Sequence, residues 1–186
     1  MKARAGKTPP GYQVVDAEPV SRIIDTRLGK VGVLLFPQGP VPGRAPTPAQ
    51  EQKVLAAGRA LRAQTVLLLG VSPWGLVGEK QFLPRARGVF DCILGGGEGV
   101  GFAQSLSEKS PGVLWLRPDG KGRAVNVVEI LEVPKRDVRP QAQAQNGNDP
   151  VWIDGRTFRA ELEFLDSSFP SDPAMRKIIG VPSAED

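Results

Sequence analysis

The chain has 186 residues, of which 40% are hydrophobic and 24% charged, with a formal net charge of +4 and a sequence pI of about 9.5. These proportions are typical of a soluble globular protein, and we expect a single domain over residues 1–186 that buries about 70% of its unfolded surface. Acidic and basic residues alternate without a basic block interleaved with aromatic residues, so we expect no nucleic-acid binding. No apolar run approaches the roughly 18 residues of a membrane span.

The sequence contains no histidine and only one cysteine, Cys92. The lack of histidine excludes the commonest general base, the commonest metal ligand and every Ser-His or Cys-His nucleophile. A lone cysteine excludes an internal disulfide and a thiolate zinc site, and in its apolar surroundings we expect it to be a small buried side chain. No cofactor is predicted. The start, MKARAGKTPPGYQ, lacks the apolar segment of a secretory signal, so a cytoplasmic location is expected for the chain as written.

The first part of the chain alternates predicted strands and helices. An extended segment over 1–19 precedes a strand in SRIIDT and a turn at Gly29. Three apolar runs then predict strands, the first two buried on both faces, over residues 31–36, 65–71 and 89–94.

A helix is predicted to begin after Thr47. Thr47 is a favourable N-cap, Pro48 occupies the first helical position and Gln50 completes a capping box. Apolar side chains then recur at helical spacing, at Val54, Leu55, Ala57 and Leu61. A second helix of about one or two turns is predicted over 78–86, ending near Pro84.

After the glycine-rich stretch the pattern changes to successive strands. They are predicted over residues 112–117, 124–133 and 156–165, with the turn PDGKG joining the first two as a hairpin. A polar, mobile loop is expected over 134–150, a short helix over 171–180 with Asp172 as N-cap, and a tail over 181–186. The whole order predicts an α/β fold with an α+β tendency, built on a mixed sheet with flanking short helices.

Five glycines and one glutamate fall between Gly95 and Gly101, directly after a predicted strand. Such loops can bind phosphate through backbone N–H groups, but this one has neither the Lys-Ser/Thr of a P-loop nor the helix of a dinucleotide fingerprint. A tight turn is therefore favoured. A second loop, SPWG, follows the preceding strand at the sheet edge where ligands collect in open α/β sheets. The candidate ligand-binding residues of the two loops are Ser72, Trp74, Gly95, Gly96, Gly97, Glu98 and Gly99.

Other chemistry is limited to carboxylates and one serine. Ser72 has no histidine to activate it and no G-x-S-x-G context, so it is interpreted as a turn residue. Four acids lie near predicted strand ends and could hold a hard cation, although no D-x-D or EF-hand spacing is present. They are Asp25, Glu79, Asp91 and Glu98.

Several segments, taken in order, resemble the carboxyl-terminal half of the calcineurin-like metallophosphoesterases, in particular the 5'-nucleotidase branch. They are GKVGVLLF, a helix ending ALRAQ, TVLLLGVSPWG, GVFDCILGGGEG and GVLWLRPDGKGRAVNVVEI, covering about residues 20–133. In that family one strand ends in Ser-His, the next in D-x-I-x-G-G-H-x-H, and later strands hold a G-K-x-x-G-R turn. The resemblance implies half of a β-sandwich, in which two metal ions activate a bridging water for attack on a phosphate ester.

The departures from the family pattern are at its metal ligands. Pro73 aligns with the first histidine, and Gly97 and Gly99 align with the histidine pair. The Asp-x-His, Gly-Asp-x-x-Asp and Gly-Asn-His-Asp/Glu motifs of the first half are absent from the sequence as well. The resemblance therefore implies a domain whose metal site is lost.

Two classes of function remain open. The first is a non-catalytic structural or protein-binding module that binds a partner protein or a second copy through an exposed sheet face. The second is half of a metal-dependent phosphoesterase, which uses Asp91, Glu98 or Glu79 and needs a partner chain to complete its metal site. Anion binding by the glycine loop without hydrolysis is a further alternative. The family is often exported, in contrast to the location expected from the first residues.

Overall fold

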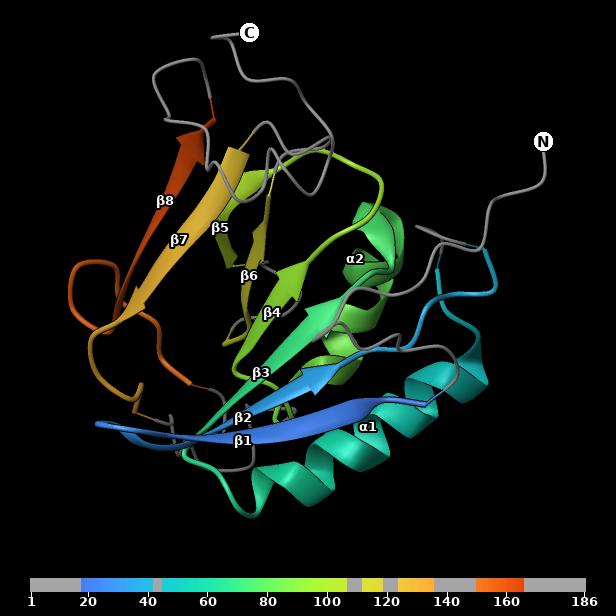
Figure 1. Cartoon of the computed structure of the whole chain (residues 1–186), viewed down its shortest axis with the longest axis horizontal. Coiled ribbons are helices and arrows are strands. Elements are labelled where there is room, and N and C mark those ends of the chain that lie inside the picture. Colours follow the sequence, from blue (N-terminus) through green and yellow to red (C-terminus); the bar gives the residue numbers. More distant parts are fainter. Residues whose placement is uncertain (1–17, 42–44, 107–111, 119–123, 136–149, 166–186) are drawn as a thin grey trace, which may run out of the picture.

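The computed structural model describes residues 18–41, 45–106, 112–118, 124–135 and 150–165. Figure 1 shows three layers: two helices, a six-stranded mixed sheet, and a two-stranded sheet on the face opposite the helices. The large sheet has the order β1-β2-β3-β4-β6-β5, and β7 pairs with β8 in the small one. The elements are β1 (Val20–Thr26), β2 (Gly29–Leu35), α1 (Pro48–Arg62), β3 (Leu67–Ser72), α2 (Gly75–Ala86), β4 (Cys92–Gly95), β5 (Phe102–Leu106), β6 (Leu114–Arg117), β7 (Ala124–Ile130) and β8 (Phe158–Phe164).

The centre of the large sheet is parallel. β2, β3, β4 and β6 pair in parallel, whereas β1 and β5 are antiparallel to their neighbours at the two edges. The structure confirms a mixed α/β fold. The apolar runs of β2 and β3 predicted burial on both faces, but Val33 and Leu35 of β2 and Leu69 and Val71 of β3 are only half-buried on the face opposite the helices. Among the described residues, no helix is long and apolar enough to span a membrane.

The start of α1 follows the predicted capping box. The Thr47 side chain accepts from the Gln50 backbone N–H, and the Gln50 side chain accepts from the Thr47 N–H at 3.0 Å. α1 then buries Val54, Leu55 and Leu61 against the sheet.

α2 is longer than predicted. It begins at Gly75 and continues through Pro84 to Ala86, instead of ending near the proline. Phe82, Leu83 and Ala86 are all fully buried in the core shared with α1, and this packing outweighs the backbone hydrogen bond that a proline removes from the last turn.

The predicted hairpin between residues 112–117 and 124–133 is wrong. β6 pairs with β4 and β5, and β7 pairs with β8 in the other sheet. Every residue of β6 is buried, so it needs layers on both faces, whereas β7 alternates and suits an outer layer. β5, which sequence patterns did not predict, takes the edge position beside β6.

The two faces of the large sheet have separate cores. The helices cover one face with aromatic packing around Phe36, Trp74, Phe82 and Phe90. On the other face, β7, β8 and Trp152 cover the β4–β6 side, and the Trp152 indole N–H donates to the carbonyls of Asp91 and Gly112, at 3.1 Å each.

The second face is only partly covered on its β1 side. Aliphatic residues at neighbouring register positions of β1, β2 and β3 are half-buried or exposed there, in contrast to the buried Leu114 and Leu116 of β6. We call this surface the open face. Its aliphatic residues are Ile24, Val33, Leu35, Leu69 and Val71, and Arg22, opposite Val33, lies on the same face. The predicted C-terminal helix and tail, almost all of the 134–150 loop and all but the end of the 1–19 segment lie outside the described residues.

Candidate functional site: the glycine loop at the carboxyl end of the parallel strands

The end of β3 is packed into the protein interior. Ser72 is 2% exposed, and its hydroxyl oxygen accepts from the Trp74 backbone N–H at 3.2 Å, which is the geometry of a serine turn. The Trp74 indole N–H donates to the Pro37 carbonyl at 2.7 Å, and its ring lies 4.7 Å from that of Phe36 and 5.1 Å from that of Phe82. Both side chains are thus held by the core.

The glycine loop after β4 comes close to the protein's own side chains. A Cβ added at Gly95 would lie 2.1 Å from a Glu79 carboxylate oxygen, and one added at Gly99 would lie 2.5 Å from the Leu76 Cβ. Gly97 and Gly99 also have φ values of 75° and 125°, which favour glycine. These glycines therefore allow the loop to approach α2 closely.

The loop is attached to the first turn of α2. The Gly75 N–H donates to the Gly96 carbonyl at 3.0 Å, and the Leu76 N–H donates to the Glu98 carbonyl at 2.8 Å. No side chain caps this helix at Trp74. Loop carbonyls therefore satisfy N–H groups that would otherwise be available to an anion at the start of a helix.

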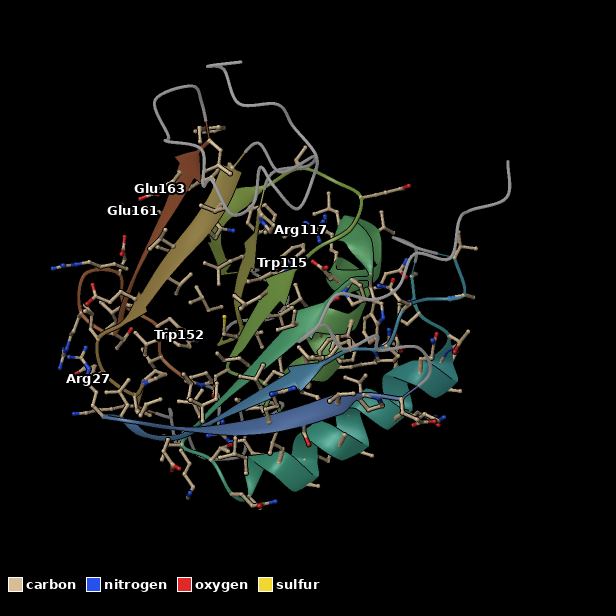
Figure 2. The ribbon with its side chains drawn as sticks, in the orientation of Figure 1. Arg27, Trp115, Arg117, Trp152, Glu161 and Glu163 are labelled. Atoms are coloured by element: carbon tan, nitrogen blue, oxygen red, sulfur yellow. The ribbon has the colours of Figure 1, made fainter. Side chains whose placement is uncertain are left out.

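Arg117, the last residue of β6, holds the loop from inside. Its Nη2 atom donates to the carbonyls of Gly96, Gly97 and Glu98 at 3.0, 3.3 and 3.0 Å, and its Nε donates to the Val100 carbonyl at 3.3 Å. Figure 2 shows Arg117 and Trp115 together near the carboxyl end of the strands. Guanidinium N–H groups thus occupy the interior of the turn.

Glu79 on α2 neutralises that arginine. The Glu79 side chain is 0% exposed and that of Arg117 is 1% exposed, and the two form an ion pair. The carboxylate also accepts from the Trp115 indole N–H at 2.9 Å and from the Gly96 N–H at 3.1 Å. Burial raises the pKa of Glu79, whereas Arg117, Trp115 and Gly96 act against that rise.

The four candidate carboxylates do not converge. Asp25 is exposed and pairs with Lys30, and the Glu98 residue lies exposed on the loop. Asp91 lies at the opposite end of β4, where it accepts from the Leu68 N–H at 2.7 Å and pairs with Arg62. No group of three or more His, Cys, Asp or Glu residues suited to a metal ion occurs within the described ranges.

The three positions that the resemblance predicts to replace histidines have no metal-binding side chains. Pro73 lies in the turn after β3, and Gly97 and Gly99 lie in the exposed part of the loop. Ligand binding by the seven candidate residues remains a prediction. Of these residues, only Gly97, Glu98 and Gly99 are exposed.

Arg117 and Trp115 were not identified from the sequence. The only available indication was an arginine ending an otherwise apolar strand, LWLR, because a charged residue within a fully buried segment requires a partner.

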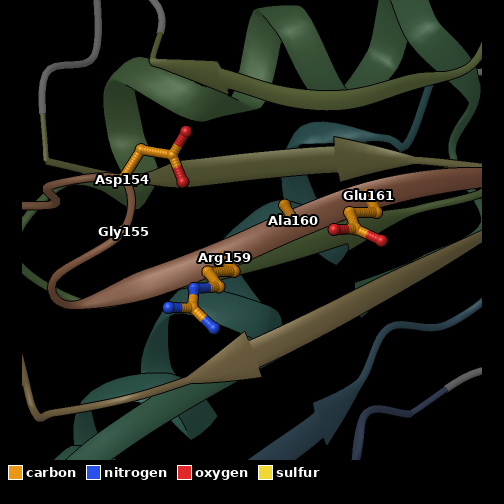
Figure 3. Close-up of a pocket in the computed structure, with 5 residues that line it drawn as sticks. All are labelled: Asp154, Gly155, Arg159, Ala160 and Glu161. Atoms are coloured by element: carbon orange, nitrogen blue, oxygen red, sulfur yellow. The ribbon is translucent and has the colours of Figure 1, made fainter.

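A shallow depression lies elsewhere, at the start of β8 (Figure 3). It has a volume of about 320 Å³ and is lined by Asp154, Gly155, Arg159, Ala160 and Glu161. Its charged side chains belong to exposed residues, so it has the character of a solvated surface and not of an enclosed binding pocket.

The chain was compared with protein-family models, curated proteins and solved structures, and none of them matches it.

Proposed function

We propose that this protein is a non-catalytic, metallophosphoesterase-like domain that acts as a structural or protein-binding module. The observation on which the proposal depends is the occupied interior of the glycine loop. Arg117 donates to three consecutive loop carbonyls, and two loop carbonyls accept from the start of α2. A loop closed by its own protein has a structural role that requires no ligand.

The available side chains also disfavour phosphoesterase chemistry. Two-metal catalysis needs several ligands converging on positions a few ångströms apart. The chain has no histidine, Glu79 is engaged by Arg117, and Asp91 lies at the other end of its strand. A phosphoesterase in which this chain forms one half would have to obtain nearly all of its ligands from its partner.

The open face supports a binding role. It places aliphatic side chains of β1, β2 and β3 side by side on a surface that β7 and β8 leave partly uncovered. Contiguous apolar surface of this kind marks interaction sites in soluble proteins. A partner with an aliphatic surface would complete the layer that β7 and β8 begin.

An activity assay tests the non-catalytic part. Purified protein is incubated with Mn²⁺ and either a nitrophenyl phosphate or a series of nucleotides, with and without chelator. We expect no turnover above a control purification from cells lacking the chain. Chelator-sensitive turnover that stays with the protein at constant specific activity would contradict the proposal.

A dye-binding assay tests the open face. Leu35→Lys should lower the fluorescence of an apolar dye, because it introduces a charge into the face. The control is Val77→Lys, at a 66% exposed position on α2, behind the other face of the sheet. Equal dye binding by the wild type and both variants would show that the open face is not an accessible apolar surface.

A further inference from the structure

β1 is the edge strand at one end of the large sheet. Its seven residues have no bulge in their pairing with β2 and no proline, and two isoleucines at its centre, Ile23 and Ile24, are 41% and 50% exposed between the charged residues Arg22 and Asp25. Proteins normally protect such edges with bulges, charges or covering segments, because free backbone groups recruit further strands.

The other edge of the large sheet is less regular. β5 has a register irregularity between Phe102 and Ser105 and contacts both strands of the small sheet. β8 places Arg159, Glu161 and Glu163 on alternate positions of its outward side, as Figure 2 shows for the two glutamates. Of the two edges of the large sheet, β1 is thus the one more suited to pairing.

The backbone groups of β1 point alternately toward β2 and away from it. β1 and β2 are joined by the two-residue loop 27–28, with Thr26 opposite Gly29. In such a hairpin the closing pair is hydrogen-bonded, and bonded and non-bonded pairs then alternate along the ladder. This alternation directs the N–H and C=O groups of Ser21, Ile23 and Asp25 away from β2.

We propose that β1 pairs antiparallel with β1 of a second copy, with Ile23 on the two-fold axis. In an isologous antiparallel pair the axis is perpendicular to the sheet and passes between two copies of the same residue, in either a hydrogen-bonded or a non-bonded pair. An axis at Arg22 would place two guanidinium groups opposite each other, and one at Ile24 would set Ser21 opposite Arg27 of the turn. An axis at Asp25 would place two carboxylates opposite each other, and one at Ser21 would bring Pro19, which has no N–H, into the ladder. Only an axis at Ile23 pairs all three outward residues.

The chemistry of this register is self-complementary. Ile23 packs on Ile23 of the second copy, and Ser21 lies opposite Asp25 of the second copy, so that a hydroxyl faces a carboxylate. About six backbone hydrogen bonds form across the edge. The arrangement leaves the Asp25–Lys30 ion pair of each copy in place.

The pairing also extends the open face. Because the axis is perpendicular to the sheet, the open faces of both copies lie on the same side, and Ile24 of each copy lies opposite Arg22 of the other at the junction. The inference rests on the proposed function in one respect, since it names a second copy as the partner of the binding module.

Sedimentation of the full chain over a range of concentrations tests the dimer. We expect a dimer with a dissociation constant in the micromolar range, because one strand edge gives a small interface. Ile23→Lys should weaken it by about a hundredfold or more, since two ammonium groups would meet at the axis. The control Val77→Lys should leave it unchanged.

Cysteine cross-linking tests the register. Ile23→Cys should form a disulfide-linked dimer on mild oxidation, because the two Cα atoms would lie about 5.5 Å apart. Ser21→Cys should not, because its symmetry mate would lie four residues along the strand, about 14 Å away. Cys92 is buried and does not compete.

Three outcomes would overturn the inference. They are a wild-type monomer at concentrations of about 100 µM, a dimer that Ile23→Lys does not weaken, and cross-linking of Ser21→Cys equal to that of Ile23→Cys. Failure of the proposed function has a different signature. Metal-dependent turnover would overturn the non-catalytic role while the cross-linking pattern of the edge stayed as expected.

Discussion

Arg117→Met removes the guanidinium from inside the glycine loop and retains an unbranched side chain. The Glu79 carboxylate then stays buried without its counter-charge, at 0% exposure. Breaking a buried pair by removing one partner costs about 3–5 kcal/mol. For a chain of this size that loss lowers the melting temperature by about 6–20 °C.

Two of the loop carbonyls have second hydrogen-bond donors, which limits the loss of stability in this variant. Gly96 and Glu98 keep the hydrogen bonds that their carbonyls accept from Gly75 and Leu76, whereas the carbonyls of Gly97 and Val100 lose the contact with Arg117. The cost should therefore come mainly from the buried charge. Hydrogen exchange of the loop should accelerate more than that of β2 and β3.

The stability deficit of this variant should depend on pH. Burial already raises the pKa of Glu79, and removing Arg117 removes a group that acts against the rise. A carboxyl whose pKa is raised on folding stabilises the fold below its unfolded pKa and loses that contribution as pH rises through the folded value. The deficit should therefore be larger at neutral pH than near the ordinary glutamate pKa.

Thermal and urea unfolding at both pH values measure these effects. Arg159→Met, at an exposed arginine on β8, is the matched control and should change stability by no more than about 0.5 kcal/mol. Adding Glu79→Gln to Arg117→Met should remove the pH dependence. A loss no larger than that of Arg159→Met, or one that does not grow with pH, would refute a buried ion pair that holds the loop.

Three further predictions concern packing and local structure. Gly95→Ala should lower the free energy of unfolding by about 1–3 kcal/mol, because its Cβ would lie 2.1 Å from Glu79. Gly96→Ala, whose Cβ would lie 3.1 Å from its nearest contact, should cost clearly less in the same unfolding assay. Burial raises the pKa of the Cys92 thiol, so a thiol reagent should label this residue only when the protein unfolds. Rapid labelling of the native protein would contradict the position of Cys92 in the core. Thr47→Ala should cost about 1 kcal/mol by removing the cap of α1, and an unchanged midpoint of urea unfolding would contradict the capping box.

Features set by neighbouring residues could be predicted from the sequence. The start of α1 depends on Thr47, Pro48 and Gln50, which lie within four positions, and the structure has the same cap. The apolar runs of β2 and β3 likewise indicated central parallel strands. Both depend on local chemistry that the chain order alone specifies.

Features set by tertiary packing could not be predicted in this way. The end of α2 passes through Pro84 because the core buries Ala86, and β6 takes a place between β4 and β5 that no turn motif indicates. The ion pair that holds the glycine loop joins Glu79 and Arg117, on different elements 38 positions apart. Only the register of the folded sheet brings such residues together.

The order of strands in the large sheet has a consequence for synthesis of the chain. β1, β2, β3 and β4 lie side by side in the order in which a ribosome produces them, so most of the sheet can assemble before the later segments emerge. The Glu79 carboxylate, however, finds its arginine only when β6 arrives. A nascent chain that pauses before residue 117 would hold an uncompensated acid in its interior, and the last step of assembly is the one that neutralises it.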